Sequence, residues 1–377
     1  MNTALLPTPA ALLDESRMQH NILRMQLRIA SLGARLRPHV KTAKCLAVAQ
    51  QQLAAGAQGI TVSTLKEAEV FFEAGITDIL YAVCIAPPKL AQVRALGLRG
   101  CALTIVVDSL AAAQAVVAEG NATGHAFDVM IEIDTDGHRA GVLPEADLLL
   151  QIGRALHDGG AVLKGVLTHA GASYECRTPE ALQAMAEQER SRCVLAAERL
   201  RAAGLPCPVV SVGSTPTALA ATSLAGVTEV RAGVYVFHDL VMHGVGVCSL
   251  DEIALSVLCT VIGHQQAKGW VLVDAGWMAM SRDRGTHEQP LDFGYGAACD
   301  EAGTPIDGLI MSGANQEHGI LSWRDGRVDS GLANRFPVGT RLRILPNHAC
   351  ATAAQFPAYD VLGADGALQR WDRFYGW

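Results

Sequence analysis

The sequence has no excess of positive charge, no long apolar run and no regular cysteine pattern, and each absence excludes a class of protein. Its 30 Lys and Arg face 37 Asp and Glu, so the net charge of −7 leaves nothing to neutralise a nucleic-acid backbone. No apolar stretch approaches the roughly 20 residues that span a bilayer. Met1 to Asp14 lack the pattern of a secretory signal. The ten scattered cysteines favour reduced thiols. We therefore expect a cytoplasmic protein that binds neither nucleic acid nor membrane.

The first 240 residues or so alternate between two kinds of segment. Short β-branched runs are followed by longer stretches of helical spacing, among them 64–74, 110–119, 145–157 and 179–203. Eight runs are predicted to be strands: 35–41, 59–63, 78–83, 103–108, 127–134, 165–169, 209–213 and 230–237. Eight strands, each followed by a helix, predict an α/β fold of the (β/α)8 barrel type. A doubly wound sheet gives a similar alternation but does not favour eight strands.

After Gly246 the pattern changes to strands without long helices between them. The predicted strands are 254–262, 270–274, 309–312 and 341–345. The pattern predicts two domains, a barrel over 12–246 and a β-rich domain over 247–377. Residues 1–11 are expected to pack against the β-rich domain, because 7–11 looks extended.

The end of the seventh predicted strand has the features of an anion site. Barrels place their chemistry at the C-terminal ends of the strands, and often bind a phosphate after strands seven and eight. Ser214 or Thr215 can cap the next helix, whose first turn accepts Pro216 and whose N–H groups then favour an anion. Gly233 would let the eighth strand approach the same anion. Plain helix capping is the commoner use of such a turn.

Lys41 gives a second indication of function. It follows the apolar Val40 at the end of the first strand, where partial desolvation favours the neutral amine that Schiff-base chemistry needs. Alone, a surface ion pair or a phosphate contact explains it better. Together with a phosphate-binding turn, Lys41 indicates a phosphorylated aldehyde cofactor, pyridoxal phosphate.

His348 and Cys350 give a third indication. They lie two residues apart after a strand, so both side chains face the same way if the chain stays extended. Imidazole and thiolate together suit zinc, and other divalent ions also accept them. A core cysteine beside a surface histidine is the usual alternative. A third protein ligand, a water or the substrate would have to complete a metal site.

Two motifs and several longer stretches are similar to those of one enzyme family. The motifs are RPHVKT at 37–42 and PNHAC at 346–350, and the stretches are IEIDTDGHRAGV, VLTHAGASYE, VVSVGSTPTALA, EVRAGVYVF and DAGWMAMSRDRGT. Together they resemble the D-serine dehydratase / D-threonine aldolase family, which are fold type III pyridoxal-phosphate enzymes related to alanine racemase. The resemblance covers essentially the whole chain. It implies an alanine racemase-like fold.

The resemblance implies a cofactor site, residue by residue. Lys41 would hold pyridoxal 5'-phosphate as a Schiff base, and Arg139 would lie near its phenolic oxygen. His169 and Tyr174 would lie around its ring. The phosphate would be held by Ser214, Thr215, Gly233 and Val234, and Tyr235 would also bind the cofactor. Many relatives read HVKTHK, whereas Ala43 stands here in place of the second histidine, so no role is assigned to that position.

The resemblance also implies a metal and an assembly. His348 and Cys350 would bind a divalent ion, which could be zinc, manganese, cobalt or magnesium. The protein would form a homodimer in which the β-rich domain of one chain closes the barrel mouth of the other.

The implied activity is that of a lyase acting on a D-3-hydroxy amino acid. Water would be eliminated from D-threo-3-hydroxyaspartate to give oxaloacetate and ammonia, and D-serine would give pyruvate and ammonia. The freed amine of Lys41 would take the α-proton, and the metal would stabilise the departing hydroxide. Arg282, Arg284 and His138 are the candidates for binding the side-chain carboxylate of 3-hydroxyaspartate.

Three other activities remain open at this point. A D-threonine aldolase would break Cα–Cβ to give glycine and acetaldehyde, but such relatives tend to carry a carboxylate where this chain has Cys350. An amino-acid racemase would need a base on each face of the substrate and no metal. A non-catalytic pyridoxal-phosphate carrier would resemble the barrel alone, so the β-rich domain with its His348 and Cys350 argues against one.

Overall fold

The computed structural model describes residues 3–377. Contacts divide the chain into two compact units. The barrel unit comprises Leu23–Gly233 and Tyr375–Trp377, and the β unit comprises the residues up to Ile22 and Val234–Phe374. Within residues 3–377 we find no helix with the length and apolar character that a bilayer-spanning segment requires.

The barrel unit is built on eight parallel strands. They are β2 (Arg35–Leu36), β3 (Ile60–Val62), β4 (Asp78–Cys84), β5 (Ala102–Val107), β6 (Asp128–Glu132), β7 (Val162–Leu167), β8 (Val209–Val212) and β9 (Glu229–Val230). Their order is β2-β9-β8-β7-β6-β5-β4-β3. A parallel bridge between His39 and Thr61 joins the two ends of this sheet, so the strands curl into a closed ring. The predicted fold class is confirmed.

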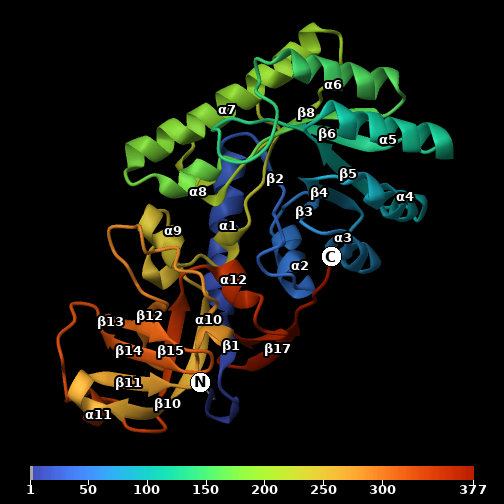
Figure 1. Cartoon of the computed structure of the whole chain (residues 1–377). Coiled ribbons are helices and arrows are strands. Elements are labelled where there is room, and N and C mark those ends of the chain that lie inside the picture. Colours follow the sequence, from blue (N-terminus) through green and yellow to red (C-terminus); the bar gives the residue numbers. More distant parts are fainter. Residues whose placement is uncertain (1–2) are drawn as a thin grey trace. The chain divides into compact units, whose positions relative to one another are not determined.

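Helices alternate with these strands along the chain. They are α1 (Glu15–Ser31), α2 (Leu46–Ala54), α3 (Leu65–Glu73), α4 (Leu90–Leu98), α5 (Leu110–Thr123), α6 (Asp147–Asp158), α7 (Pro179–Ala202) and α8 (Thr215–Ala220). Figure 1 shows α5, α6 and α7, in green, along the outside of the strands. Thr64, Ser109 and Thr178 each cap a helix by accepting a hydrogen bond from the N–H three residues later.

One predicted strand is shorter than expected. The run 230–237 was expected to be extended throughout, but β9 ends at Val230 and Val234–Val236 form a 3-10 turn. The N–H groups of Phe237 and His238 both donate to the Val234 carbonyl, at 3.1 and 2.7 Å. The chain therefore turns where its β-branched composition predicted a continuous strand.

The β unit is an antiparallel barrel with three further strands. Its strands are β1 (Ala10–Asp14), β10 (Leu255–Gln265), β11 (Trp270–Val273), β12 (Gly296–Cys299), β13 (Pro305–Ala314), β14 (Gly319–Trp323), β15 (Arg341–Pro346), β16 (Ala358–Leu362) and β17 (Leu368–Asp372). The ring runs β10-β11-β14-β13-β12-β15 and returns to β10. β1, drawn in blue among the orange and red strands of Figure 1, pairs with β10 and β16. Four short helices complete the unit: α9 (Leu240–Val245), α10 (Trp277–Met280), α11 (Leu332–Arg335) and α12 (Ala349–Ala353).

The division between the units falls at Gly233, whereas the sequence pattern placed it after Gly246. The segment 234–246 is tied to the β unit by specific contacts. Val241 N–H donates to the Asn347 carbonyl at 3.1 Å, and the ring of Phe237 packs edge-on against that of Tyr359. The barrel was predicted to start at residue 12, but the first residues of α1, up to Ile22, belong to the β unit. The Asn21 side chain donates to the Glu252 carbonyl of that unit at 2.8 Å.

A charge cluster, in which Arg37 and Glu229 are buried and Asp78 is exposed, lies at the N-terminal ends of the barrel strands. The Arg37 guanidinium donates to both carboxylate oxygens of Asp78 at 2.9 Å and to Glu229 at 3.0 Å, and Arg35 also donates to Glu229. The side chain of Arg37 is 8% exposed and that of Glu229 2%. The cluster borders a cavity of about 400 Å³. Because barrel chemistry sits at the opposite ends of the strands, we assign this cluster to stability.

Removing Arg37 should therefore destabilise the fold. We expect Arg37→Gln to lower the free energy of unfolding by about 3 kcal/mol, since it leaves buried carboxylate charge with fewer partners. Urea denaturation of the two proteins measures the difference. Arg99→Gln is the matched control, because the Arg99–Glu73 pair is about half exposed and should contribute little. Equal stability of Arg37→Gln and the wild type would contradict this assignment.

Candidate active site

Lys41 lies at the C-terminal rim of the barrel unit, two residues beyond the bridge residue His39. Its side chain is exposed, and its charge acts on the imidazoles of His39 and His169. Burial lowers the pKa of His39 well below its usual value, and the positive charges of Lys41 and Arg231 lower it further. The rim thus places an accessible amine beside histidines that stay neutral.

His169 is held in one tautomer. Its Nδ1 lies 2.9 Å from the Gly213 carbonyl oxygen, which can only accept, so Nδ1 carries the proton. Burial lowers the pKa of His169 most, the bond to Gly213 opposes this, and the charges of Lys41 and Arg139 lower it further, to about 3. The ring of Tyr174, in the turn Gly171–Glu175, lies 6.3 Å away between centroids. His169 and Tyr174 are therefore neighbours, and their placement around a cofactor ring stays a prediction.

Arg139 is anchored by a carboxylate that the sequence analysis did not single out. Its guanidinium donates to Glu132 Oε1 at 3.3 Å, and Glu132 also accepts from Cys84 Sγ at 3.1 Å. The side chain of Glu132 is 8% exposed, whereas that of Arg139 is 57% exposed. An acidic residue after three apolar ones, at the C-terminal end of the strand Asp128–Glu132, was the available signal.

The turn into α8 is capped as predicted. Ser214 Oγ accepts from Thr217 N–H at 3.2 Å, and Ser214 N–H donates to Thr217 Oγ1 at 3.1 Å. Ser173 Oγ lies 2.8 Å from Ser214 Oγ. Glu189 accepts hydrogen bonds from the N–H groups of Ala170 and Gly213, which fixes the two loops together. Thr215 is buried as the first residue of α8.

The backbone around this turn has the close approaches that a phosphate cradle requires. Gly213 has φ +139°, and a Cβ there would lie 2.1 Å from the Arg231 carbonyl oxygen. A Cβ on Gly233 would lie 3.0 Å from the His39 carbonyl oxygen. Only glycine fits these positions without displacement. Glycines, a capped helix start and buried hydroxyls fit the phosphate of pyridoxal phosphate, with Lys41 on the same rim for its aldehyde.

Val234 and Tyr235 follow Gly233 directly in the chain. They lie in the turn Val234–Val236, where the β unit begins. Their role toward the cofactor stays a prediction.

The β unit contains the two predicted metal ligands in one turn. His348 is the N-cap residue of α12 and Cys350 lies in its first turn. Burial alone would lower the pKa of His348, but the hydrogen bonds with Asp283 and Cys350 and the nearby charge of Asp239 outweigh it and raise that pKa to about 11. The thiol of Cys350 therefore lies beside the imidazole.

Two carboxylates flank this turn. Asp283 Oδ2 lies 2.6 Å from His348 Nδ1, and this hydrogen bond lowers the pKa of Asp283. Asp239 is buried and accepts the Ala349 N–H at 2.9 Å. Burial raises the pKa of Asp239, while the charge of His348 opposes the rise. The turn is thus fixed on both sides by acidic residues.

The donor set suits a divalent metal, because imidazole and thiolate are both groups that zinc and related ions accept. His348 and Cys350 offer two such groups in one turn. Among residues 3–377, no three His, Cys, Asp or Glu side chains are grouped so that they could hold a metal ion.

The three candidates for binding a second carboxylate differ in their surroundings. Arg284 donates to Asp292 at 2.8 Å, so its charge is already paired. Arg282 packs over the Trp277 ring at 4.5 Å, and no carboxylate of the described chain lies within ion-pair distance of it. His138 is exposed, and its ring lies against Gly171 in the barrel unit.

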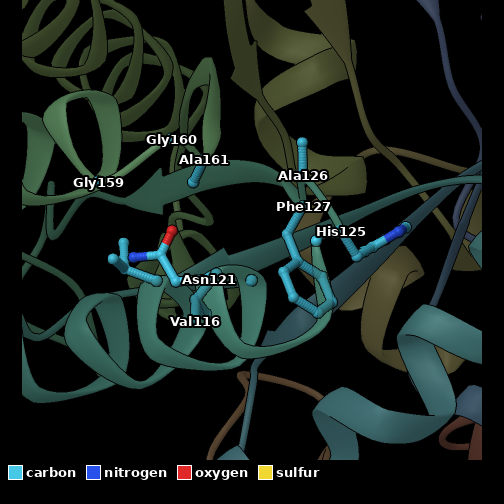
Figure 2. A pocket seen from close by; sticks show the side chains of 11 residues that line it. Val116, Asn121, His125, Ala126, Phe127, Gly159, Gly160 and Ala161 are labelled. Carbon is cyan, nitrogen blue, oxygen red and sulfur yellow. The ribbon is translucent and has the colours of Figure 1, made fainter.

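A separate hollow of about 230 Å³ lies between the C-terminal ends of α5 and α6 (Figure 2). It is lined by backbone and small side chains, with His125 and Phe127 at one side and Gly159 and Gly160 at the other. A Cβ on Gly159 would lie 2.5 Å from a methyl of Val117, so this glycine serves close packing. None of the predicted site residues lines this hollow.

Comparison with known proteins identifies two matched domains. Residues 13–240 match the alanine racemase N-terminal domain, and residues 254–362 match the serine dehydratase domain. The chain is 67% identical to a D-threo-3-hydroxyaspartate dehydratase of Delftia sp. (strain HT23), over 99% of this chain and 98% of the relative. It is 31% identical to a D-serine dehydratase of Dictyostelium discoideum, over 96% of this chain and 95% of the relative. A D-threonine aldolase of Arthrobacter sp is 30% identical, with 97% and 91% covered.

Solved structures of the Delftia enzyme have the same fold as this chain. One, described as a cysteine-to-alanine mutant in the metal-free form, matches with a TM-score of 0.98 at 66% identity and covers 99% of both chains. Another carries alanine in place of a histidine two positions before that cysteine. The chain described here belongs to the D-serine dehydratase family of fold type III pyridoxal-phosphate enzymes, whose barrel domain is that of alanine racemase.

Proposed function

We propose that this protein eliminates water from D-threo-3-hydroxyaspartate to give oxaloacetate and ammonia, using pyridoxal phosphate and a divalent metal. D-Serine, giving pyruvate, is a second substrate of the same reaction. The observation that carries the proposal is the 67% identity to the Delftia dehydratase over essentially the whole chain. The spacing of His348 and Cys350 supports it, because the histidine and cysteine replaced in that enzyme's structures are also two positions apart.

In this proposal the barrel unit holds the cofactor and the β unit holds the metal. The barrel unit would hold the cofactor, with Lys41 on its aldehyde, Arg139 near its phenolic oxygen, and His169 and Tyr174 around its ring. Its phosphate would lie among Ser214, Thr215, Gly233 and Val234, with Tyr235 also binding the cofactor. The β unit would hold the metal through His348 and Cys350. When bound, the cofactor supplies an electron sink for charge at the substrate Cα, and the metal supplies a Lewis acid for the β-hydroxyl.

The residues of the chain move the protons and orient the substrate. Lys41 Nζ would be the base that takes the proton from Cα of the bound substrate. His169 stays uncharged at neutral pH because its pKa is about 3, and it keeps its proton on Nδ1. A positively charged His169 would attract the substrate carboxylate, whereas the neutral ring does not. Removal of the Cα proton and the β-hydroxide, followed by addition of water, would leave the oxo acid and ammonia.

Arg282 is the residue that we propose to bind the side-chain carboxylate of 3-hydroxyaspartate. Arg284 already pairs with Asp292, whereas Arg282 is exposed and rests on Trp277 next to Asp283. A guanidinium stacked on an aromatic ring is preorganised for a carboxylate. D-Serine lacks this carboxylate, so Arg282 would affect one substrate and not the other.

We further propose a homodimer in the cytoplasm. The family resemblance supports the dimer, and the scattered free cysteines support a reducing compartment. Light scattering on the purified protein measures the assembly directly.

The activity itself can be tested with three substrates. Purified protein would be given D-threo-3-hydroxyaspartate, D-serine or D-threonine, with and without a chelator. We expect chelator-sensitive release of ammonia, with oxaloacetate from the first substrate and pyruvate from the second. Glycine and acetaldehyde from D-threonine, without ammonia from the other two, would make the protein an aldolase.

His348→Ala should abolish elimination while the cofactor stays bound. We expect the rate of ammonia release to fall about a thousand-fold, since a Lewis-acid metal is worth several kcal/mol in the transition state. Cofactor absorbance and bound metal would be measured on the same sample. His287→Ala, in an exposed position near the turn, is the control and should keep its metal. Full ammonia release by His348→Ala would remove the metal from the mechanism.

Arg282→Gln should change substrate preference. We expect kcat/KM for D-threo-3-hydroxyaspartate to fall about 10- to 100-fold, since a charged hydrogen bond is worth about 1.5–3 kcal/mol. The value for D-serine should stay within about twofold. An equal loss for both substrates would show that Arg282 does not recognise the second carboxylate.

A further inference from the structure

We propose that Asp283 is a positioning residue for the metal, acting through His348. It would fix which imidazole nitrogen faces the ion, and so set how tightly the ion is held. The inference rests on the metal site of the proposed function and extends it to a residue outside the ligand pair. Three features of the β unit carry it.

The first feature is the contact itself. Asp283 Oδ2 lies 2.6 Å from His348 Nδ1. This short distance indicates a charge-assisted hydrogen bond. An imidazole that binds a metal is neutral and keeps one proton. A carboxylate can only accept, so that proton lies on Nδ1 and the nitrogen that remains for the ion is Nε2. The Cys350 thiol beside the same imidazole then gives the second ligand.

The second feature is how Asp283 is held. Ser281, two residues before Asp283, is buried and has a left-handed φ of +73°. A non-glycine residue adopts such a φ only where its surroundings impose it. Ser281 Oγ accepts the Asp283 N–H at 3.2 Å. The Asn347 side chain donates to the Asp283 carbonyl at 3.2 Å and to the Gly294 carbonyl at 2.7 Å. The loop is therefore tied directly to the residue before His348.

The third feature is how the ligand turn is held from the other side. Asp239 accepts the Ala349 N–H at 2.9 Å, and Thr352 Oγ1 donates to the Met280 carbonyl at 2.7 Å. The segments 280–283 and 347–352 are thus joined by three hydrogen bonds, through backbone and side chains. Such anchoring keeps the Asp283–His348 bond in place before any ion arrives, which is how outer carboxylates raise the affinity of histidine ligands.

A matched pair in the same loop gives the control. Asp292 also faces an imidazole, with His287 Nδ1 at 3.4 Å, but it shares its carboxylate with Arg284 at 2.8 Å. His287 is exposed and lies outside the ligand turn. Removing the charge of Asp292 should therefore leave the metal affinity unchanged, although the chemical change is the same as at Asp283.

The test is a titration of cobalt(II) into the metal-depleted, cofactor-loaded protein. Competition with a chromogenic chelator gives the affinity, and the visible cobalt bands beyond the cofactor absorbance report the ligand geometry. Wild type, Asp283→Ala, Asp283→Asn and Asp292→Asn would be compared. Cofactor content and thermal midpoint show that each variant is folded.

We expect Asp283→Ala to weaken cobalt binding about 10- to 100-fold, the usual cost of losing an outer-shell partner. Asp283→Asn still offers Nδ1–H an acceptor, so its affinity should recover toward the wild-type value with the same cobalt spectrum. Asp292→Asn should bind as the wild type does.

Two results would overturn the inference. Wild-type affinity in Asp283→Ala would show that Asp283 positions nothing. An Asp283→Asn variant as weak as Asp283→Ala, with altered cobalt bands at saturation, would make Asp283 a direct ligand. Failure of the wild type itself to bind one cobalt per chain would instead contradict the metal part of the proposed function.

Discussion

Closure of the parallel sheet beside Lys41 is the constraint on which the cofactor site depends. The Val40 N–H donates to the Thr61 carbonyl at 2.9 Å, and the Thr61 N–H donates to the Pro38 carbonyl at 2.8 Å. On the other side, His39 N–H donates to the Ala232 carbonyl at 2.8 Å. The segment 38–40, which leads to Lys41, is therefore hydrogen-bonded to β3 on one side and to the segment that follows β9 on the other. Without these bonds the ring of strands would be open next to Lys41, the residue proposed to hold the cofactor.

Charge is distributed differently in the two units. At the barrel rim, burial and positive neighbours keep His39 and His169 neutral, while the side chain of Lys41 is exposed. In the ligand turn of the β unit, acidic neighbours surround His348 and favour a positive charge near it. A bound divalent ion would neutralise that excess of negative charge. The same imidazole side chain thus serves opposite purposes because its neighbours differ.

The sequence predicted those parts that rest on local pattern. Strand and helix alternation predicted the barrel, and the Ser-Thr-Pro-Thr run predicted the cap at Ser214, since both depend on neighbours along the chain. Asp283 was missed although its neighbours Arg282 and Arg284 were considered, because its role depends on a contact with a residue 65 positions away. The boundary at Gly233 could not be read either, because the contacts of 234–246 with Asn347 and Tyr359 are distant in sequence.

The most direct test of the account is a crystal structure of the protein loaded with pyridoxal phosphate and manganese, with the ion located by its anomalous signal. The account predicts continuous density from Lys41 Nζ to the cofactor, with its phosphate at the turn 213–215. It also predicts one anomalous peak within bonding distance of His348 Nε2 and Cys350 Sγ. A peak at other residues, or a cofactor bound away from Lys41, would contradict it.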